Sequence, residues 1–393
     1  MRKPAHIAMV GCTAPSHIYP SLALIRELVD RGHRVTYVVG EPLTGLVAPT
    51  GAEPIAHPTI LPQGDTPWPE DPATAMRVFL DEGIAVLPQL TAHYDADRPD
   101  LVLYDIGGLP GPLLGARYGV PAVQLSPTMV AWTGYEQDMV DFFTALTSSP
   151  SGQDYYATFD TWLAEHGIHE DSRTFVTFPK RVLSLIPRVM QPNADRVPDT
   201  VRFVGPCLDP ARLTEPGWTP PTDGRPVLLV SFGTAYNDQL PVYRACLEGF
   251  ADSRWHVVIA IGDKVDSAEL GQLPGNVEVH RRVPQLVVLA HASAFVTHAG
   301  MGGCTEALWF GVPTVAIPQA VDQFGNAQQL VDAGVGRLLP AEEVTAETLR
   351  AAVDAVADDA PLRDRLAGTR SEVRANGGTT KAADAVQSFL TER

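Results

Sequence analysis

The chain has 393 residues, 45% of them apolar, and a formal net charge of −17. The length favours one large or two ordinary domains. The acidic balance argues against nucleic acids and anionic membranes as main partners, because both attract basic surfaces. The opening MRKPAHIAMVG has too short an apolar run for a secretory signal, and no run reaches membrane-spanning length. The cysteines form no metal-ligand or redox pattern and suit a reducing cytoplasm, which is the expected location; they are Cys12, Cys207, Cys246 and Cys304.

Strand-like apolar runs and helical patterns alternate through the first half of the chain. Strands are predicted at residues 6–11, 34–40, 101–105 and 122–126. Helices are predicted over residues 20–31, 74–94 and 111–119. The first of these helices begins at Pro20, a residue that suits a first helical turn. This alternation predicts an α/β domain with a doubly wound parallel sheet.

Two polar side chains stand at strand ends in this half. His17 lies in the turn after the first strand, just before the predicted helix, and Asp105 closes the strand LVLYD. Both turns open on the same edge of a parallel sheet, where ligands bind in such folds. A histidine held by a carboxylate is what general-base chemistry needs, because the carboxylate fixes the tautomer and stabilises the imidazolium. Each residue also has a structural reading, as a solvent-facing histidine and as an aspartate that caps a turn.

Residues 127–178 are less regular and contain the aromatic-rich stretches WTGYEQDMVDFFTALT and YYATFDTWLAEHGI. Their aromatic side chains suit either an apolar ligand pocket or the ordinary core faces of helices. The proline-rich loop 58–72 suits a lid or a variable binding loop. The candidate pocket residues are Trp68, Phe79, Met129, Trp132, Tyr135, Phe142 and Phe143.

A domain change is predicted near residues 206–226, where Pro, Gly and charged residues are dense. Strands and helices alternate again beyond this stretch, which predicts a second α/β domain. The predicted organisation is a first domain, a linker, a second domain and a C-terminal helix, with bounds 1–207, 208–225, 226–376 and 377–393.

Two strand-to-helix turns of the second domain contain glycine. SFGTAY follows the strand VLLVS, and HAGMGG joins the strand AFVT to CTEALWF, which suits a helix. Such a turn aims backbone N–H groups and the positive end of a helix at an anion, and glycine lets a phosphate approach closely. A glycine turn of this kind can also have a purely structural role, through tight packing or as a turn capped by a hydroxyl. The candidate phosphate contacts of the HAGMGG turn are His298, Gly300, Gly302 and Gly303.

Hydrogen-bond acceptors follow these turns. Glu306 lies a few residues into the helix and suits a pair of ribose hydroxyls, because a carboxylate only accepts hydrogen bonds. Asp322 and Gln323 follow the strand TVAIP, at the strand end where ligands bind in open α/β sheets. An acid beside an amide suits a polyol such as a sugar.

The order of these motifs is VPQ, then VTHAGMGG, then EAL, GVP and AVDQFGNA. It resembles the nucleotide-sugar signature of the UDP-dependent glycosyltransferases of small molecules, most of all the bacterial macrolide glycosyltransferases of the oleandomycin type. The resemblance covers nearly the whole chain. It implies two Rossmann-like domains facing each other across a cleft (GT-B), with the last helix crossing back to the first domain. It also implies inverting transfer of glucose from UDP-glucose, without a metal or other cofactor, to a hydroxyl of a hydrophobic small molecule.

The resemblance also implies roles for individual residues. SHIYP occupies the place of the family's GHxNP, so His17 is expected to be the general base and Asp105 its partner, although Ser16 and Tyr19 depart from that motif. Asp322 and Gln323 are expected to contact the sugar, and the aromatic residues above the acceptor. The expected nucleotide and diphosphate contacts are Ser231, Gly233, Thr234, Arg282, Val283, Gln285, His298, Gly300, Gly302, Gly303, Cys304 and Glu306.

Two departures affect the donor. Arg282 stands where the family often has a tryptophan that stacks on the base; a guanidinium can stack too, but uracil and thymine both stay open. Gly302 and Gly303 replace an asparagine and a serine, which keeps backbone donors and removes side-chain contacts.

Other functions fit parts of the pattern. A TDP-deoxysugar-dependent antibiotic glycosyltransferase is the nearest alternative, and a non-catalytic sugar-nucleotide-binding partner protein is a further one. The pair His17 and Asp105 and the aromatic segment speak against a sugar-nucleotide 2-epimerase. GCTAPSH lacks the G-x-G-x-x-G pattern of nicotinamide-dependent oxidoreductases. The sequence leaves the acceptor and the oligomeric state open.

Overall fold

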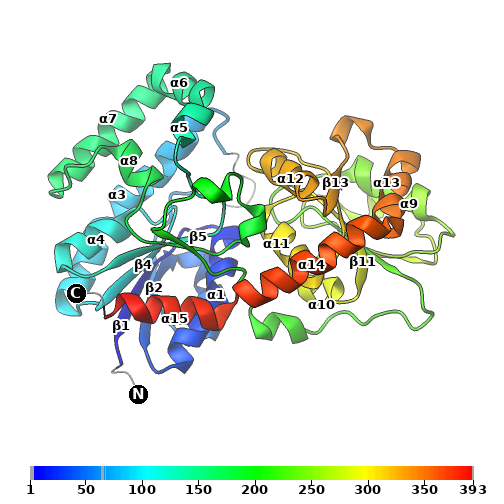
Figure 1. Cartoon of the computed structure of the whole chain (residues 1–393), viewed down its shortest axis with the longest axis horizontal. Helices are drawn as coiled ribbons and strands as arrows, with labels where there is room; N and C mark the ends of the chain where they lie inside the picture. The colour runs from blue at the N-terminus through cyan, green and yellow to red at the C-terminus, as the bar shows by residue number, and fades with distance from the viewer. Residues whose placement is uncertain (1–3, 63–65, 67, 392–393) are drawn as a thin grey trace. The chain divides into compact units, whose positions relative to one another are not determined.

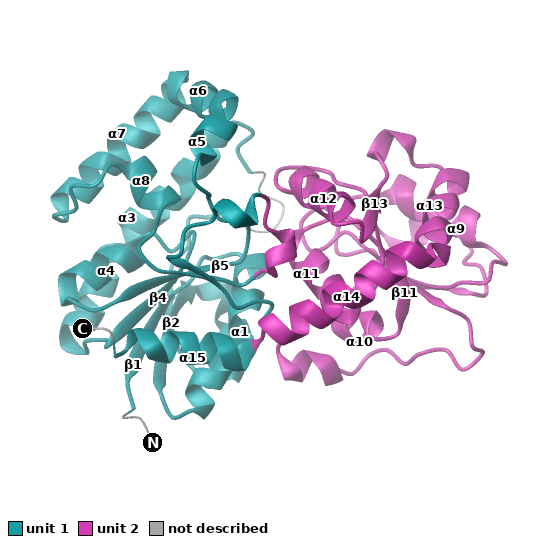
Figure 2. Ribbon diagram, viewed as in Figure 1, with its two compact units in different colours: residues 1–185, 193–207, 379–393 teal, residues 186–192, 208–378 magenta. Residues whose placement is uncertain are grey.

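The computed structural model describes residues 4–62, 66 and 68–391, traced in Figure 1. The chain forms two compact units (Figure 2). The first unit contains residues Met1–Leu185, Asn193–Cys207 and Thr379–Arg393, and the second contains Ile186–Pro192 and Leu208–Gly378. Within the described residues, no helix has both the length and the apolar character needed to span a membrane.

The first unit is built on a parallel sheet with strand order β3-β2-β1-β4-β5-β6-β7. Its central strands are buried along their whole length, as expected for apolar runs covered on both faces. The strands are β1 His6–Val10, β2 Arg34–Gly40, β3 Glu53–His57, β4 Leu101–Asp105, β5 Ala122–Ser126, β6 Val182–Ser184 and β7 Val201–Phe203.

Helices accompany this sheet in chain order, as in a doubly wound fold. They are α1 Pro15–Asp30, α2 Thr44–Val47, α3 Pro72–Ala96, α4 Pro110–Tyr118, α5 Tyr135–Asp138, α6 Val140–Ser148, α7 Pro150–Glu165, α8 Ser172–Thr177 and α15 Thr379–Phe389. Its short 3-10 helices are η1 Glu41–Leu43, η2 Ala48–Thr50 and η4 Ala194–Arg196. The second unit contains the 3-10 helices η3 Arg188–Met190, η5 Pro210–Thr214, η6 Ser267–Leu270 and η7 Ala341–Glu343.

The first helix begins earlier than the sequence pattern predicts. Pro15, not Pro20, occupies its first turn, and the helix continues through Pro20. The fixed φ of proline suits a first turn, and two prolines offer two possible starts, of which the structure takes the earlier. His17 therefore lies inside the first turn of α1 and not in the turn before it.

The last helix packs on the first helix of the same unit. Val386 and Phe389 of α15 lie in the apolar core that also contains Leu24 of α1. The Arg31 guanidinium at the end of α1 donates to Asp384 Oδ1 at 2.6 Å and to Gln387 Oε1 at 2.8 Å. The C-terminal segment therefore supplies part of the core of the unit in which the chain begins.

The second unit repeats the architecture with strand order β10-β9-β8-β11-β12-β13, again entirely parallel. Its strands are β8 Val227–Ser231, β9 His256–Ala260, β10 Val277–His280, β11 Ala292–Thr297, β12 Thr314–Ala316 and β13 Gly336–Leu338. Its helices are α9 Leu240–Phe250, α10 Gln285–Leu289, α11 Met301–Phe310, α12 Gln323–Asp332, α13 Ala346–Asp358 and α14 Ala360–Asn376. Two Rossmann-like parallel-sheet domains confirm the predicted fold class.

The units differ from the predicted boundaries in two places. The predicted linker, residues 208–225, belongs to the second unit, because Trp218 is 8% exposed and packs in a core cluster with Val227 and Phe295. The short segment 186–192 also belongs to the second unit, where the Gln329 side chain donates to the Val189 carbonyl at 2.9 Å. The density of proline and glycine indicated that the chain changes units near residues 206–226. It did not indicate which of the two units this segment packs against.

Candidate active site

His17 and Asp105 meet at the edge of the first sheet. Strand β1 lies between β2 and β4, so the winding direction changes between β1 and β4, and ligands bind beside such a switch point. Asp105 is the last residue of β4, and His17 lies in the helix that follows β1. His17 Nδ1 lies 2.9 Å from Asp105 Oδ1, which also accepts from the Gly107 N–H at 2.8 Å.

The burial of this pair fits a base that faces a ligand. The Asp105 side chain is 3% exposed and the His17 side chain 25% exposed. Because a carboxylate only accepts hydrogen bonds, a neutral His17 ring donates from Nδ1 and has its lone pair on Nε2. The arrangement can therefore accept a proton at Nε2 and stabilise the imidazolium that results.

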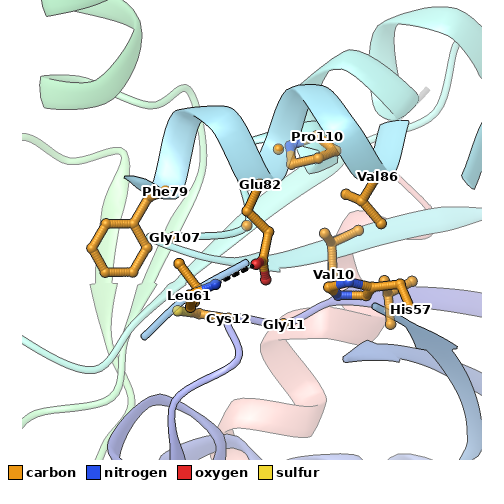
Figure 3. A pocket seen from close by; sticks show the side chains of 13 residues that line it. Val10, Gly11, Cys12, His57, Leu61, Phe79, Glu82, Val86, Gly107 and Pro110 are labelled. Atoms are coloured by element: carbon orange, nitrogen blue, oxygen red, sulfur yellow. Dashed lines mark hydrogen bonds between the residues drawn. The ribbon is translucent and has the colours of Figure 1, made fainter. Parts of the chain in front are cut away.

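A small cavity lies beside the pair and has room for about one water molecule, with a volume of about 10 Å³ (Figure 3). Cys12 and Gly107 line it from the strand ends, and Leu61, Phe79 and Glu82 line it from the loop after β3 and from α3. Phe79 is the predicted pocket residue among these lining residues. A cavity of this size does not hold a drug-sized molecule.

The Glu82 carboxylate of α3 links the loops that follow β1 and β3. It is 9% exposed, accepts from Thr13 Oγ1 at 3.0 Å and Thr59 Oγ1 at 2.7 Å, and accepts from the N–H groups of Ile60 and Leu61 at 2.9 and 3.2 Å. Figure 3 shows the bond to Leu61. Sequence reasoning missed Glu82, because nothing in a helical pattern distinguishes it from other helical acids.

Cys12, His17 and Asp105 also form a possible metal-ligand group, with ligand atoms within 4.8 Å of one another. Burial, together with the charges of Asp105 and Glu82, raises the pKa of the Cys12 thiol well above its usual value.

The predicted aromatic residues form two groups. Trp68 stacks on Phe79 with ring centroids 5.3 Å apart. Tyr135 contacts both Trp132, at 4.8 Å, and Phe143, at 5.7 Å, and Phe142 contacts Phe143 at 5.4 Å between centroids; Met129 is half-buried just before this second group. Exposed fractions of 43% for Trp68 and 42% for Phe142 leave apolar surface for a ligand. Of the proposed lid loop, residues 63–65 and 67 lie outside the described residues.

The second unit has its own switch point, between β8 and β11. Ser231 ends β8 and pairs in register with Thr297 at the end of β11, so the two glycine turns that follow lie side by side. Helix α11 begins at Met301 with Gly300 as its N-cap, and the Cys304 N–H is bonded to the Gly300 carbonyl at 3.1 Å. The first-turn N–H groups before Cys304 have no intrahelical acceptor and can bind an anion. Thr234 is exposed nearby, whereas the Cys304 side chain is buried.

His298 packs between the two glycine turns. A Cβ atom at Gly233 would lie 2.7 Å from His298 Cε1, and one at Gly300 would lie 2.5 Å from His298 Nε2, so both positions require glycine. Burial lowers the pKa of His298 to about 4, with a backbone hydrogen bond to Ser231 opposing the shift. At neutral pH His298 is therefore an uncharged imidazole.

Glu306 and Gln285 form a connected polar group in the second unit. Gln285 Nε2 donates to Glu306 Oε2 at 2.6 Å, and Arg212 Nη1 donates to Glu306 Oε1 at 3.2 Å. Glu306 is 8% exposed. Arg212 lies in the segment predicted as a linker and was missed, because charge within a proline- and glycine-rich stretch is typical of solvent-exposed chain.

The predicted sugar residues lie at the start of α12. Asp322 is exposed, and its Oδ2 accepts from the fully buried Asn326 Nδ2 at 3.0 Å. Gln323 is 2% exposed, and its Oε1 accepts from the N–H groups of Gln319 at 2.8 Å and Ala320 at 3.2 Å, so its amide NH₂ is the group that can bind a ligand. Val321, just before them, is 73% exposed with φ 46°, an uncommon value for a β-branched residue.

Arg282 and Val283 follow β10 at the same edge. Arg282 is largely exposed, and its Nη2 donates to Asp263 Oδ2 at 2.6 Å. Val283 packs against the core cluster that contains Trp218. The Arg282 guanidinium is therefore held by a carboxylate at the place where a base-stacking group was predicted.

Comparison with known proteins identifies the family. Oleandomycin glycosyltransferase of Streptomyces antibioticus is 46% identical over 396 residues, covering 99% of this chain and 92% of that protein. An NDP-glycosyltransferase of Bacillus licheniformis is 34% identical and covers 98% of each chain. The chain belongs to the macrolide and antibiotic glycosyltransferase family. The family resemblance of the sequence is thereby confirmed.

Further comparisons support this membership. Residues 245–388 of this glycosyltransferase match the family model described as the C-terminal domain of erythromycin biosynthesis protein CIII-like proteins. The crystal structure of the glycosyltransferase of kitacinnamycin is 44% identical, with a TM-score of 0.92 over 99% of this chain and 100% of that one. The calicheamicin glycosyltransferase CalG4 is 32% identical, with a TM-score of 0.88 over 100% and 99%.

Proposed function

We propose that this glycosyltransferase moves glucose from UDP-glucose to a hydroxyl of a hydrophobic small molecule, a macrolide or another polyketide or phenolic natural product. The observation that carries the proposal is the His17–Asp105 pair, with Nδ1 and Oδ1 2.9 Å apart. The base that we propose is Nε2 of the same ring. The 46% identical relative, named for oleandomycin, supports an acceptor of this class.

In the proposed reaction the acceptor hydroxyl gives its proton to His17 Nε2 while its oxygen bonds to the anomeric carbon of glucose. The bond from that carbon to the diphosphate oxygen breaks, UDP leaves, and the configuration at the anomeric carbon inverts. Asp105 stabilises the imidazolium by accepting from Nδ1–H. In this displacement the C–O bond to the acceptor forms and the C–O bond to the diphosphate breaks. The proton stays on His17 until solvent removes it.

The proposed donor site stabilises the leaving diphosphate by hydrogen bonding. The first-turn N–H groups of α11 near Gly302, the Thr234 hydroxyl and the neutral His298 imidazole are the donors that we place around the phosphate oxygens. Asp322 and the Gln323 amide are placed on the glucose hydroxyls. None of these contacts requires a metal ion.

A TDP-deoxysugar donor is the second candidate. The demethyllactenocin mycarosyltransferase of Streptomyces fradiae is 31% identical over 98% of this chain and 87% of that protein, and its name describes transfer of a mycarosyl group. Arg282, in place of a base-stacking tryptophan, is compatible with either base. A donor panel of UDP-glucose, TDP-glucose and TDP-deoxysugars separates the two candidates by which nucleoside diphosphate is released.

The proposed base is tested by mass spectrometry of products from UDP-glucose and a panel of macrolides and flat phenols. We expect a product heavier by one hexosyl unit, and a loss of about 10²- to 10⁴-fold in turnover for His17→Ala. UDP binding, measured by calorimetry, should be unchanged in this variant. Asp105→Asn should lose turnover as well, and His169→Ala, at an exposed histidine of the same unit, should not. Substantial turnover in His17→Ala would refute the assignment of the base.

A further inference from the structure

Arg212 is fixed in place by its own segment. The 3-10 helix η5, Pro210–Thr214, is capped by the buried Asp209, whose Oδ1 accepts from the Ala211 N–H at 3.0 Å. Helix η5 packs against α10, the helix that begins with Gln285. Both groups that donate to Glu306 therefore come from elements packed on each other, although Arg212 and Glu306 are 94 residues apart in the sequence.

The two donors orient the Glu306 carboxylate without saturating it. Arg212 takes one lone pair on Oε1, and Gln285 takes one on Oε2. A carboxylate offers about four acceptor positions, so one remains on each oxygen. A pair of neighbouring hydroxyls, one to each oxygen, is the donor arrangement that completes this set. In a group only 8% exposed, a lone pair left without a donor is costly.

We propose that Arg212 is a positioning residue of the donor site. It holds the Glu306 carboxylate so that both oxygens accept from the 2′- and 3′-hydroxyls of a ribose, and it thereby makes the protein select ribonucleotide over 2′-deoxyribonucleotide donors. The inference rests on the proposed function for the location of the nucleotide. It adds a residue from outside the predicted motif and a reason for choosing between UDP and TDP donors.

The test compares the binding of UDP and 2′-deoxy-UDP by calorimetry, with no sugar and no acceptor present. The unmodified protein should bind UDP about 10- to 100-fold more tightly, because a hydrogen bond to a charged group contributes about 1.5–3 kcal/mol. In Arg212→Gln the preference should fall to about threefold or less, mainly through weaker UDP binding. Arg212→Met keeps the apolar stem and should show the same loss, so that a folding defect in one variant leaves the other informative.

A matched control comes from the same segment. Arg225 is exposed and pairs with Asp223 at 3.1 Å, and Arg225→Gln should keep the full preference for UDP. A purely structural role of Arg212 would lower the affinity for both nucleotides equally and would overturn the proposal. Tighter UDP binding in Arg212→Gln would also overturn it, because the guanidinium would then cover the carboxylate and not position it. Failure of glucosyl transfer would refute the proposed function and leave this binding result standing.

Discussion

Two glycines make room for one histidine in the second unit. Gly233 and Gly300 each face the His298 ring at a distance that a Cβ atom could not tolerate, whereas a Cβ at Gly302 would meet nothing within 4 Å. The sequence predicted all three as places where a phosphate approaches the backbone. In the structure Gly233 and Gly300 allow His298 to pack against the backbone. Gly302 has no such neighbour, so its lack of a side chain leaves space at the start of α11.

Two alanine substitutions should separate these roles. Gly302→Ala should keep or slightly raise the melting temperature, since alanine favours a helix over glycine by about 0.5–1 kcal/mol, and should weaken UDP binding about tenfold by crowding the helix N-terminus. Gly300→Ala should lower stability by about 1–3 kcal/mol, because the new methyl group overlaps His298. Thermal unfolding and calorimetry measure both effects. Undiminished UDP affinity in Gly302→Ala would contradict the proposed anion site.

The neutral state of His298 gives the second unit a dependence on pH. Its pKa is about 4 in the folded protein against an ordinary value of 6.5, so between these values the unfolded chain binds a proton that the folded chain does not. Stability should be complete above pH 6.5 and should decline toward pH 4, by on the order of 3 kcal/mol from this group.

The measurement is chemical unfolding at neutral pH and at pH 5 for the unmodified protein and for His298→Gln. The variant should lose less stability on acidification. Burial also lowers the pKa of His6 in the first unit, so His6→Gln serves as the comparison that separates the two units. An identical loss in the unmodified protein and in His298→Gln would show that His298 is not the source.

At the scale of elements, helix α12 connects the two loops that we assign to the diphosphate and the sugar. Asn326 Nδ2 donates at 3.0 Å both to the Ala299 carbonyl, in the turn after β11, and to Asp322 Oδ2, at the start of α12. Ala299 and Val321 have φ values of 61° and 46°, uncommon for residues with a side chain. Backbone strain of this kind clusters at functional sites and needs surrounding contacts to persist.

Replacing Asn326 should disturb both loops at once. We expect Asn326→Ala to lose about 1–3 kcal/mol of stability by leaving the buried Ala299 carbonyl without this donor, and Asn326→Asp to lose more, because a second carboxylate would face Asp322. Activity with UDP-glucose should fall in the same order. Thermal unfolding and kcat/KM measure this, with Gln328→Ala as the control, since Gln328 bonds to Asp332 on the exposed side of the same helix. Equal stability of the two Asn326 variants would argue against this role.

The sequence allowed the elements and the strand-end residues to be predicted, but not the groups that hold them. β1, β4, β8 and β11 are apolar runs followed by turn residues, so the ends where His17 and Asp105 stand could be located from the pattern. Glu82, Arg212 and Asn326 could not, because each acts through partners in other elements and has no pattern of its own. The short strands β6, β7 and β13 carry too few residues for a period to be recognised.

At the scale of the whole molecule, the first unit depends on the last helix of the chain. Phe389 is 2% exposed in its core, and Arg31 bridges α1 to α15. Phe389→Ala should lower the stability of this unit by about 3–5 kcal/mol, because the substitution leaves a cavity. UDP binding, which we place in the second unit, should change little at temperatures where both units are folded.

The measurement is thermal unfolding with and without UDP, with Lys381→Ala, an exposed position on the same helix, as the control. We expect two transitions in Phe389→Ala, of which the lower one is insensitive to UDP. A single transition that UDP still shifts in full would show that the two units unfold together and that α15 stabilises both.

The chain passes between the two units four times, after Leu185, Pro192, Cys207 and Gly378. A ribosome therefore delivers the seven strands of the first sheet long before it delivers the helix that covers α1. When the last residue of the second unit has been synthesised, α15 is still missing and the apolar side of α1 is exposed. Chaperones bind exposed apolar surface at such a stage. No single cut in the chain separates two intact units, and the unit whose synthesis begins first is the last to be completed.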